Sequence, residues 1–469
     1  MVRHQRQSVK RGSVERARTL RGRALQGRSY TLDGRGKRWQ KIKRKRKIKI
    51  KSPALYAPRS TLHAPTSTLH ATPEPLPRTP IFNSFFAGGF ECSTFKLRSG
   101  QRLDLVAATR HDEFAQQDYL RLQERGMRVA REGVRWHLVE QTPGKYDFSS
   151  VVPIARAARA TGTQVIWDLC HFGWPDHFDL FKPDFVTSLA AFGAAFAKWL
   201  NQEIDQSGWF VPINEISFFS WASGEEGSLY PFVTGRGFEL KTQLVRAAIQ
   251  TMEAIWAVAP ASRFMHVDPI IHVVASPRHP EEQPEAEAYR RSQFQAWDML
   301  GGLLWPELGG QAKYLDVLGV NFYPHNQWFY DLKKFRRIRR FTPITPRHSL
   351  YRPFREMLGE VWERYHRPLF VAETGAEDKR RPAWLRYVSQ EVEAAILEGI
   401  PLHGICLYPI LNHPGWVDDR HCHNGLWDYA DDRGRRTTYA PLAKELQRWS
   451  ARWEELAAET AGNGWGLVD

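Results

Sequence analysis

Eight short apolar segments alternate with helix-like segments from residue 81 to the C-terminus. The strand candidates are 81–90, 127–136, 163–170, 209–214, 263–268, 315–322, 368–373 and 402–408. The helix-like segments between them are 113–125, 151–160, 184–203, 239–257, 287–300, 351–365 and 383–397. Alternating β and α units predict a parallel sheet covered on both faces. Eight such units predict an α/β fold of the (β/α)8 TIM barrel type.

The first strand candidate is not followed by a glycine-rich phosphate loop. A doubly wound, nucleotide-binding sheet is therefore the weaker interpretation of the same alternation.

The positive charge of the chain is concentrated at one end. The whole chain has a formal charge of +15, yet residues 1–51 alone contain 20 Lys and Arg against Glu15 and Asp33. A segment this basic and this poor in apolar residues cannot bury enough surface to fold. Residues 1–80 are therefore predicted to be a disordered basic arm and a Pro/Ser/Thr linker, and residues 81–469 the folded domain. The arm has no interleaved aromatics, so nucleic-acid binding is not favoured.

The spacing of the cysteines and the hydropathy of the chain are typical of a cytoplasmic protein. Cys92, Cys170, Cys406 and Cys422 are widely spaced and are expected to be reduced thiols in or near the core. No segment is long and apolar enough to predict a membrane span, and no apolar segment follows a basic start as in a secretory signal. A cytoplasmic location is expected, and the sequence does not indicate an oligomeric state.

Two strand candidates end on a glutamate or directly before one. The segment 368–373 is an apolar run that ends on Glu373, followed by Thr374 and Gly375. The segment 209–214 ends in the same way, with Asn214 followed by Glu215. A carboxylate at the rim of a buried core is partly desolvated, so its ionisation must be supported by neighbouring groups. In a (β/α)8 barrel the C-terminal strand ends form the site, so both glutamates are expected there.

Other polar and aromatic residues also fall at or just after predicted strand ends. Amide, imidazole and carboxylate groups bind hydroxyls, and indole rings cover the apolar face of a sugar, so the set suits a polyhydroxylated ligand. Its members are Glu91, Arg131, Trp136, His171, Trp174, Asn214, His266, Asp268, Asn321, Tyr323, Tyr408, His413 and Trp416.

Two carboxyl groups on either side of a glycosidic bond are sufficient to hydrolyse it. One must be protonated to assist the leaving group, and the other must be ionised, so their pKa values must differ. Arg131 and Tyr323, expected near Glu373, would favour its ionised form, whereas Glu215 has no obvious cation. A retaining mechanism requires the two carboxyls to be about 5–5.5 Å apart.

The sequence around these residues resembles glycoside hydrolase family 1, the β-glucosidase group of the retaining (β/α)8 clan. The resemblance covers roughly residues 81–445. It rests on Asn214-Glu215, 129–136 (VAREGVRW), His171, 318–323 (LGVNFY), 372–375 (AETG) and the loop 412–416 (NHPGW) with 424–428 (NGLWD).

The resemblance implies specific roles. Glu373 would be the nucleophile and Glu215 the acid/base, with Arg131 and Tyr323 beside the nucleophile. Substrate-binding residues would be Glu91, Arg131, His171, Asn214, Asn321, Tyr323, Tyr408, His413 and Trp416. The substrate would be a β-glycoside or oligosaccharide, and neither a metal nor another cofactor is required. The sequence differs from the family at Thr374 and Ala376, and near strand 1, where Glu91 or Ser93 stands close to the position of a family glutamine. His413 also replaces a hydroxyl-binding residue of the family in the loop after strand 8.

Three alternatives remain open from the sequence. A transglycosylase would use the same two carboxylates with an acceptor other than water. A catalytically silent carbohydrate-binding protein would keep the pocket without turnover. The cluster His421-Cys422-His423 with Asp418 and Asp419 contains metal-ligand residue types, but its spacing fits no structural zinc motif.

Overall fold

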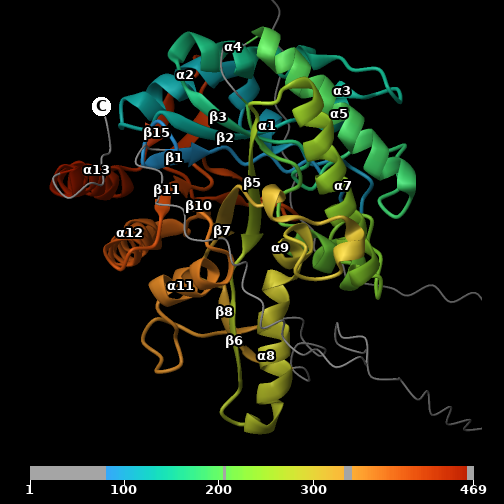
Figure 1. Cartoon of the computed structure of the whole chain (residues 1–469). Helices are drawn as coiled ribbons and strands as arrows, with labels where there is room; N and C mark the ends of the chain where they lie inside the picture. Colours follow the sequence, from blue (N-terminus) through green and yellow to red (C-terminus); the bar gives the residue numbers. More distant parts are fainter. Residues whose placement is uncertain (1–80, 204–207, 332–340, 462–469) are drawn as a thin grey trace, which may run out of the picture. The chain divides into compact units, whose positions relative to one another are not determined.

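The structure is a computed structural model that describes residues 81–203, 208–331 and 341–461 of the 469-residue chain. Within these residues eight parallel strands close into a barrel in the order β1-β11-β10-β7-β5-β4-β3-β2 (Figure 1). Their bounds are β1 Phe86–Gly89, β2 Val129–Gly133, β3 Gln164–Asp168, β4 Trp209–Val211, β5 Arg263–Pro269, β7 Val317–Asn321, β10 Leu369–Thr374 and β11 Leu402–Leu407. All eight strands fall within or next to the predicted segments, so the predicted barrel is confirmed.

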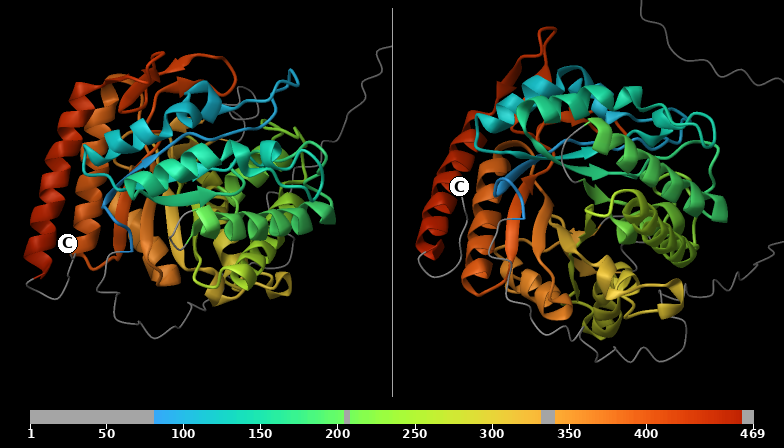
Figure 2. Two further views of the ribbon diagram at one scale, coloured as in Figure 1. Left: turned by 90° about the horizontal axis from the view of Figure 1, so that it is seen from above. Right: turned by 45° about the horizontal axis from the view of Figure 1, so that its top comes forward.

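Helices surround the barrel on its outer side (Figure 2). The longer ones are α2 His111–Gln123, α4 Val152–Thr161, α5 Pro183–Glu203, α7 Gly237–Val258, α8 Gln283–Arg291, α9 Gln295–Leu300, α11 Phe354–Tyr365, α12 Arg381–Leu397 and α13 Ala440–Ala461. The short ones are α1 Leu105–Ala108, α3 Trp136–Val139 and α6 Ile216–Ser220. Every helix predicted from the sequence is present, and the predicted segment 287–300 is divided between α8 and α9.

Alternation along the strands separates an inner from an outer set of side chains. The inner cluster lies inside the barrel and includes Val129, Ile166, Val211, Val267 and Tyr408. The outward-facing residues of the same strands join the larger core between sheet and helices. Arg131, two residues after Val129, belongs by this alternation to the inner set.

A bulge changes this alternation at the end of β10. Phe370 pairs with Gly319 and Val371 with Val320, but Glu373 and not Ala372 pairs with Asn321 of β7. One extra residue in a strand shifts all later side chains to the opposite face, and bulges commonly aim a side chain in this way. Glu373 therefore points into the barrel beside Asn321, whereas simple alternation from Phe370 would turn it outward.

Several elements were not predicted from the sequence. β6 His272–Ala275, β8 Gln327–Tyr330 and β9 Thr342–Pro343 form a separate three-stranded sheet, packed with α8 away from the barrel (Figure 1). β12 His413–Pro414 pairs with β13 His421–Cys422, and β14 Trp427–Ala430 pairs with β15 Arg436–Thr438. α13 packs alongside α12 as the outermost helix of that side (Figure 2).

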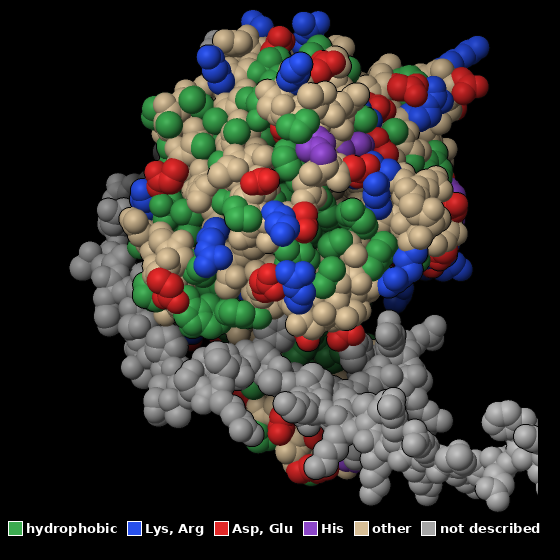
Figure 3. Space-filling view, turned by 90° about the vertical axis from the view of Figure 1, so that its right-hand side faces the viewer, with side chains coloured by type: hydrophobic (Ala, Val, Ile, Leu, Met, Phe, Trp, Pro, Cys, Tyr) green, Lys and Arg blue, Asp and Glu red, His purple; other side chains and the backbone are tan. Residues whose placement is uncertain are grey.

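The remaining predictions on class and organisation have different outcomes. The basic arm and linker at 1–80 lie outside the described residues, so the domain boundary at residue 81 stays a prediction. All four cysteines are free and buried, as expected. Among the described residues, no helix has the length and hydropathy of a membrane span. On the face in Figure 3, acidic and basic side chains of the described residues are interspersed.

Candidate active site

Glu373 is held in place through both its backbone and its carboxylate. Phe322 N–H donates to its carbonyl at 2.9 Å, and the next residue, Thr374, is bonded through its carbonyl to Tyr408 N–H, also at 2.9 Å. Glu373 Oε1 accepts from Arg131 Nη1 at 2.7 Å, and its Oε2 accepts from Tyr323 Oη at 2.9 Å. A guanidinium and a phenol on one carboxylate both stabilise its ionised form.

Arg131 is the centre of the buried polar network. It is fully buried on β2, and its Nε and Nη2 donate to the two oxygens of Asp168 at 3.1 and 2.7 Å. Nη2 also donates to Asn214 Oδ1 at 2.7 Å. Burial alone would lower the pKa of Arg131, but the charges of Asp168 and Glu373 outweigh it and the net shift is upward. A permanent buried cation therefore lies between two carboxylates.

Glu215 lies in a different environment. It is the N-terminal capping residue of α6 and has a left-handed backbone (φ 47°), fixed by its N–H bond to the carbonyl of Val267 at 3.0 Å. Asn321 Nδ2 donates to its Oε1 at 2.7 Å. Burial, and then the negative charge of Glu373, raise the pKa of Glu215 well above its usual range. The two glutamates, 158 positions apart, are thus close enough to interact and differ in their electrostatic support.

His171 and Asn214 form a hydrogen-bonded chain with a defined tautomer. The Oδ1 of Asn214 accepts from Arg131, so its amide nitrogen faces His171 Nε2, at 3.3 Å. His171 Nε2 must then accept, and Nδ1–H donates to Asp168 Oδ2 at 2.7 Å. Tyr408 Oη lies 3.4 Å from the same Nε2. The imidazole of His171 is therefore oriented by three neighbours.

The last predicted ligand residues are Glu91, His413 and Trp416. Glu91 Oε1 accepts from the N–H and hydroxyl of Ser93 at 3.0 and 2.6 Å, and its charge helps to raise the pKa of Tyr323, after burial and the two other glutamates. His413 uses both ring nitrogens within its own loop, with Pro414 O at 2.7 Å and Asn424 Nδ2 at 2.9 Å. Their roles in binding stay predictions.

Trp416 is half-buried in the loop after β11. Its ring packs edge-on against Phe172 at 5.8 Å, and Phe172 in turn contacts the ring of His171 at 4.9 Å. Trp416 is therefore linked to the polar network through a single aromatic side chain.

Three residues predicted at the rim of the pocket lie elsewhere. His266 and Asp268 alternate with the inner residues Met265 and Val267 of β5, so they face outward toward the helices. His266 Nε2 lies 3.3 Å from Met252 Sδ on α7. Trp136 is not on β2 but begins α3, where it stacks on Phe192 in the outer core. The prediction for Trp136 was wrong because β2 ends at Gly133. The prediction for His266 and Asp268 was wrong because an apolar run does not show which side chains of the strand face the inside of the barrel.

Two residues of the network were not predicted to belong to the site. Asp168 sits at the end of β3 and neutralises Arg131, and the only signal for it was one carboxylate in the apolar run 163–170. Cys92 is a buried thiol whose Sγ lies 3.6 Å from Tyr408 Oη. Burial raises the pKa of Cys92 well above its usual range, so it stays a neutral thiol.

Metal-ligand residue types occur twice among the described residues. Cys92, Asp168 and His171 lie close together, but Asp168 already forms a buried ion pair with Arg131. His421, His423 and Asp428 form the second group, at the surface.

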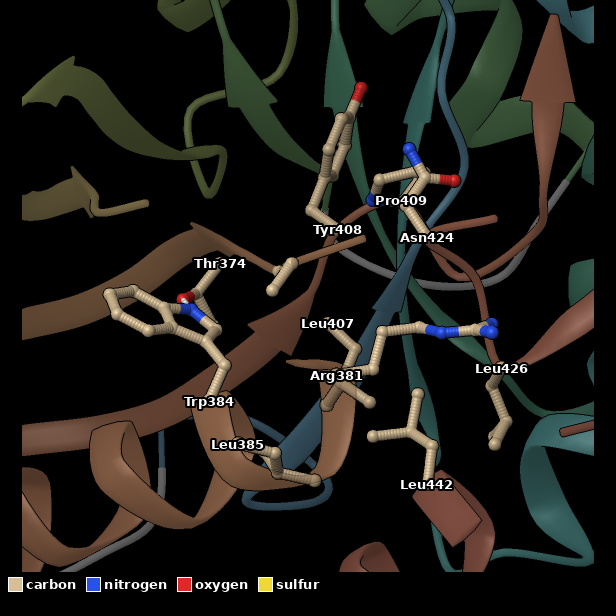
Figure 4. A pocket seen from close by; sticks show the side chains of 12 residues that line it. Thr374, Arg381, Trp384, Leu385, Leu407, Tyr408, Pro409, Asn424, Leu426 and Leu442 are labelled. Atoms are coloured by element: carbon tan, nitrogen blue, oxygen red, sulfur yellow. Dashed lines mark hydrogen bonds between the residues drawn. The ribbon is translucent and has the colours of Figure 1, made fainter. Parts of the chain in front are cut away.

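A small cavity lies outside the barrel, behind the end of β10. It is lined by residues from β10, α12, β11, the segment that follows β11, and α13, including Thr374, Trp384, Leu407 and Leu442 (Figure 4). Arg381 crosses it, but its Nη1 already donates to Gly425 O at 2.6 Å. A chiefly apolar lining on the outer face does not suit a sugar. The barrel interior at Glu215 and Glu373 remains the candidate site.

Replacing Arg131 with methionine is expected to destabilise the fold by about 3–5 kcal/mol, because Asp168 and Glu373 would be left buried and unpaired. The free energy of unfolding from urea titration measures this loss. Arg263→Met is the matched control: Arg263 binds Asp316 through two bonds of 2.6 and 2.7 Å, but its side chain is 44% exposed. An exposed pair is worth about 1 kcal/mol or less. Equal losses in the two variants would contradict the central role of Arg131.

Known structures share this fold. No protein-family model and no curated protein matches the sequence. The family 1 β-glucosidase from Thermotoga maritima superposes with a TM-score of 0.61 at 15% identity, covering 82% of this chain and 98% of that one. The AHE enzyme from Alicyclobacillus herbarius gives 0.63 at 16%, covering 79% and 99%. The described residues therefore have the barrel fold seen in family 1 β-glucosidases, and the resemblance predicted from the sequence is confirmed for the fold.

Proposed function

We propose that the protein is a retaining glycoside hydrolase that cleaves β-glycosidic bonds, with Glu373 as nucleophile and Glu215 as acid/base. The observation that carries this proposal is the unequal support of two neighbouring carboxyl groups. Glu373 accepts from Arg131 and Tyr323, whereas burial and the charge of Glu373 raise the pKa of Glu215. Opposite protonation of paired carboxyls is what glycoside hydrolysis requires.

In the first step, Glu373 attacks the anomeric carbon while protonated Glu215 donates its proton to the departing oxygen. The C–O bond to the aglycone breaks, and a glycosyl ester with Glu373 forms. Loss of the charge on Glu373 lowers the electrostatic penalty for ionised Glu215, which supports the proton transfer in this direction.

In the second step, Glu215 acts as the base. It takes a proton from water, whose oxygen attacks the anomeric carbon, and the ester bond breaks to release Glu373 as a carboxylate. The product then has the anomeric configuration of the substrate. Asn321 donates to Glu215 Oε1, which stabilises the ionised form that this step needs.

A 2-deoxy-2-fluoro-β-glycoside with a good leaving group tests the proposal. The fluorine slows both steps, and the good leaving group restores the rate of the first step only. The glycosyl ester should therefore accumulate. Intact mass should increase by one fluoroglycosyl group, and peptide mapping should place it on Glu373. A panel of aryl β-glycosides identifies the sugar first. If the protein binds these sugars but neither hydrolyses the glycosides nor forms the adduct, it is instead a catalytically silent carbohydrate-binding protein.

The same two steps would serve a transglycosylase with a sugar acceptor in place of water. Product analysis with and without added acceptor separates the two activities. A product formed chiefly by transfer at low acceptor concentration would overturn hydrolysis and leave the two carboxylate roles intact.

Replacing Asp268 with asparagine is expected to move the basic limb of the kcat/KM profile to lower pH. Asp268 lies behind the site and accepts from Ser217 N and Oγ at 2.9 and 3.0 Å, and Ser217 is two residues after Glu215 in the chain. Burial raises its own pKa to about 7, so it is ionised above that pH and its charge helps to hold the pKa of Glu215 up. Without this charge Glu215 loses its proton at lower pH, and the acid form required for the first step disappears earlier.

The profile should be recorded with a poor leaving group, so that proton donation limits the rate. Ser217→Ala is the matched control, because it removes one hydrogen bond from Asp268 and keeps the carboxylate. An unchanged basic limb in Asp268→Asn, or an equal shift in Ser217→Ala, would contradict this account.

A further inference from the structure

The segment after β11 brings two histidines and a carboxylate together. His421 and His423 are two residues apart around β13, so alternation places them on one face and Cys422 on the other, where it is buried. Their rings stack with centroids 4.2 Å apart. Asp428 comes from β14, and one ligand atom from each of the three residues lies within 4.8 Å of the others. Asp418 and Asp419 are near these histidines in the sequence, but the fold supplies Asp428 instead.

The hydrogen bonds of Asp428 leave part of it available. Its Oδ1 accepts from Asn412 Nδ2 at 3.1 Å and Tyr429 N at 2.8 Å, and lies 2.9 Å from His421 Nε2. Among the described residues, neither its Oδ2 nor the ring of His423 forms a hydrogen bond in this arrangement. Asn412 also binds Gly425 N through its Oδ1 at 2.8 Å, so the carboxylate is fixed in the loop before any ligand arrives.

We propose that His421, His423 and Asp428 bind a divalent transition-metal ion of the Zn²⁺ type. Two imidazoles and one carboxylate are ligands that Zn²⁺ accepts, with remaining positions filled by water. Both histidines are exposed, so an ion reaches them directly from solvent. The alternative is a simple surface His–Asp hydrogen bond with stacked imidazoles, and the two differ in metal affinity.

Such an ion would connect the two short hairpins of this segment. His421 is in β13, which pairs with β12 through His413–Cys422 and Pro414–His421, and Asp428 is in β14. β12 leads directly to Trp416. The ion would therefore hold the loop that carries His413 and Trp416. The effect of the ion on sugar binding rests on the proposed function. Metal binding and its effect on thermal stability do not depend on the proposed function.

The test uses the full chain, treated with EDTA and then dialysed, and titrated with Zn²⁺ in competition with a chromogenic chelator. One saturable site is expected. Its Kd should increase at least about 10-fold in His423→Ala and in Asp428→Asn. Zn²⁺ should raise the melting temperature of the wild type but not of His423→Ala.

His279→Ala is the matched control, because His279 is a partly exposed histidine paired with Glu281, away from β13 and β14. It should bind Zn²⁺ like the wild type. Histidines outside the described residues are present in every variant, so they do not produce a difference between variants. Absence of saturable binding, or equal binding by the wild type and His423→Ala, would overturn the site. Loss of metal binding with unchanged glycosidase kinetics would remove only the link to the sugar-binding loop.

Discussion

Glu373→Gly is expected to lower kcat for every aryl β-glycoside by at least about 10⁴-fold, to near the limit of detection. The variant removes the atom that attacks the anomeric carbon and leaves a space beside Arg131 and Tyr323. Both of these partners remain, because Arg131 is held by Asp168 and the backbone N–H of Tyr323 donates to Asn326 Oδ1. Small anions should enter that space, so azide or formate should restore turnover of substrates with activated leaving groups.

The configuration of the rescued product identifies the role. In Glu373→Gly azide attacks from the face vacated by the carboxylate, so a β-glycoside should give the α-glycosyl azide. NMR of the product distinguishes the two anomers. Glu377→Gln is the matched control, because Glu377 lies four residues further on and binds Arg420 at the surface. A folded Glu373→Gly with normal turnover would exclude Glu373 as the nucleophile.

The barrel and the two central glutamates were accessible from the sequence for a physical reason. Buried parallel strands are continuous apolar runs, and a carboxylate at the end of such a run stands out against them. The barrel then brings the ends of β4 and β10 to the same face regardless of their separation along the chain. Glu215 and Glu373 were predicted in this way, and the structure places them close enough to influence each other.

What the sequence could not supply was the direction of individual side chains. Simple alternation from Phe370 would turn Glu373 outward, and only the bulge that pairs it with Asn321 directs it inward. In the same way Asp268 resembles a pocket residue in sequence but faces Ser217 behind the site. A one-residue shift in a strand moves a side chain to the other face of the sheet. The sequence of an apolar run does not indicate where such a shift occurs.

The sequence also did not predict which side chains from distant segments pair with each other. Asp168 neutralises Arg131 from a neighbouring strand, and Asp428 joins His421 from a separate hairpin. Neither pairing has a sequence spacing that would predict it, because each depends on how strands or loops are placed side by side. Polar residues at strand ends could be predicted from the sequence. The residues that carry the opposite charge beside them could be identified only from the assembled barrel.

Glu215→Ala is expected to separate substrates by their leaving group. For an alkyl or sugar aglycone, kcat/KM should fall by about 10²–10⁴-fold, because protonation of the departing oxygen is lost. For a dinitrophenyl glycoside, whose aglycone leaves without a proton, kcat/KM should stay within about 10-fold of the wild type. The basic limb of the pH profile should also disappear, since the buried group whose pKa is raised is Glu215 itself.

Azide again distinguishes the two glutamates. In Glu215→Ala the ester on Glu373 still forms, and azide then attacks it from the side of the missing acid/base, so the product should be the β-glycosyl azide. This is the opposite anomer to that expected from Glu373→Gly. Glu215→Gln keeps the size of the side chain and its contact with Asn321 Nδ2, so it should show the same dependence on leaving group without a cavity. Equal losses on both classes of substrate, or the same anomer from both variants, would show that Glu215 does not donate the proton.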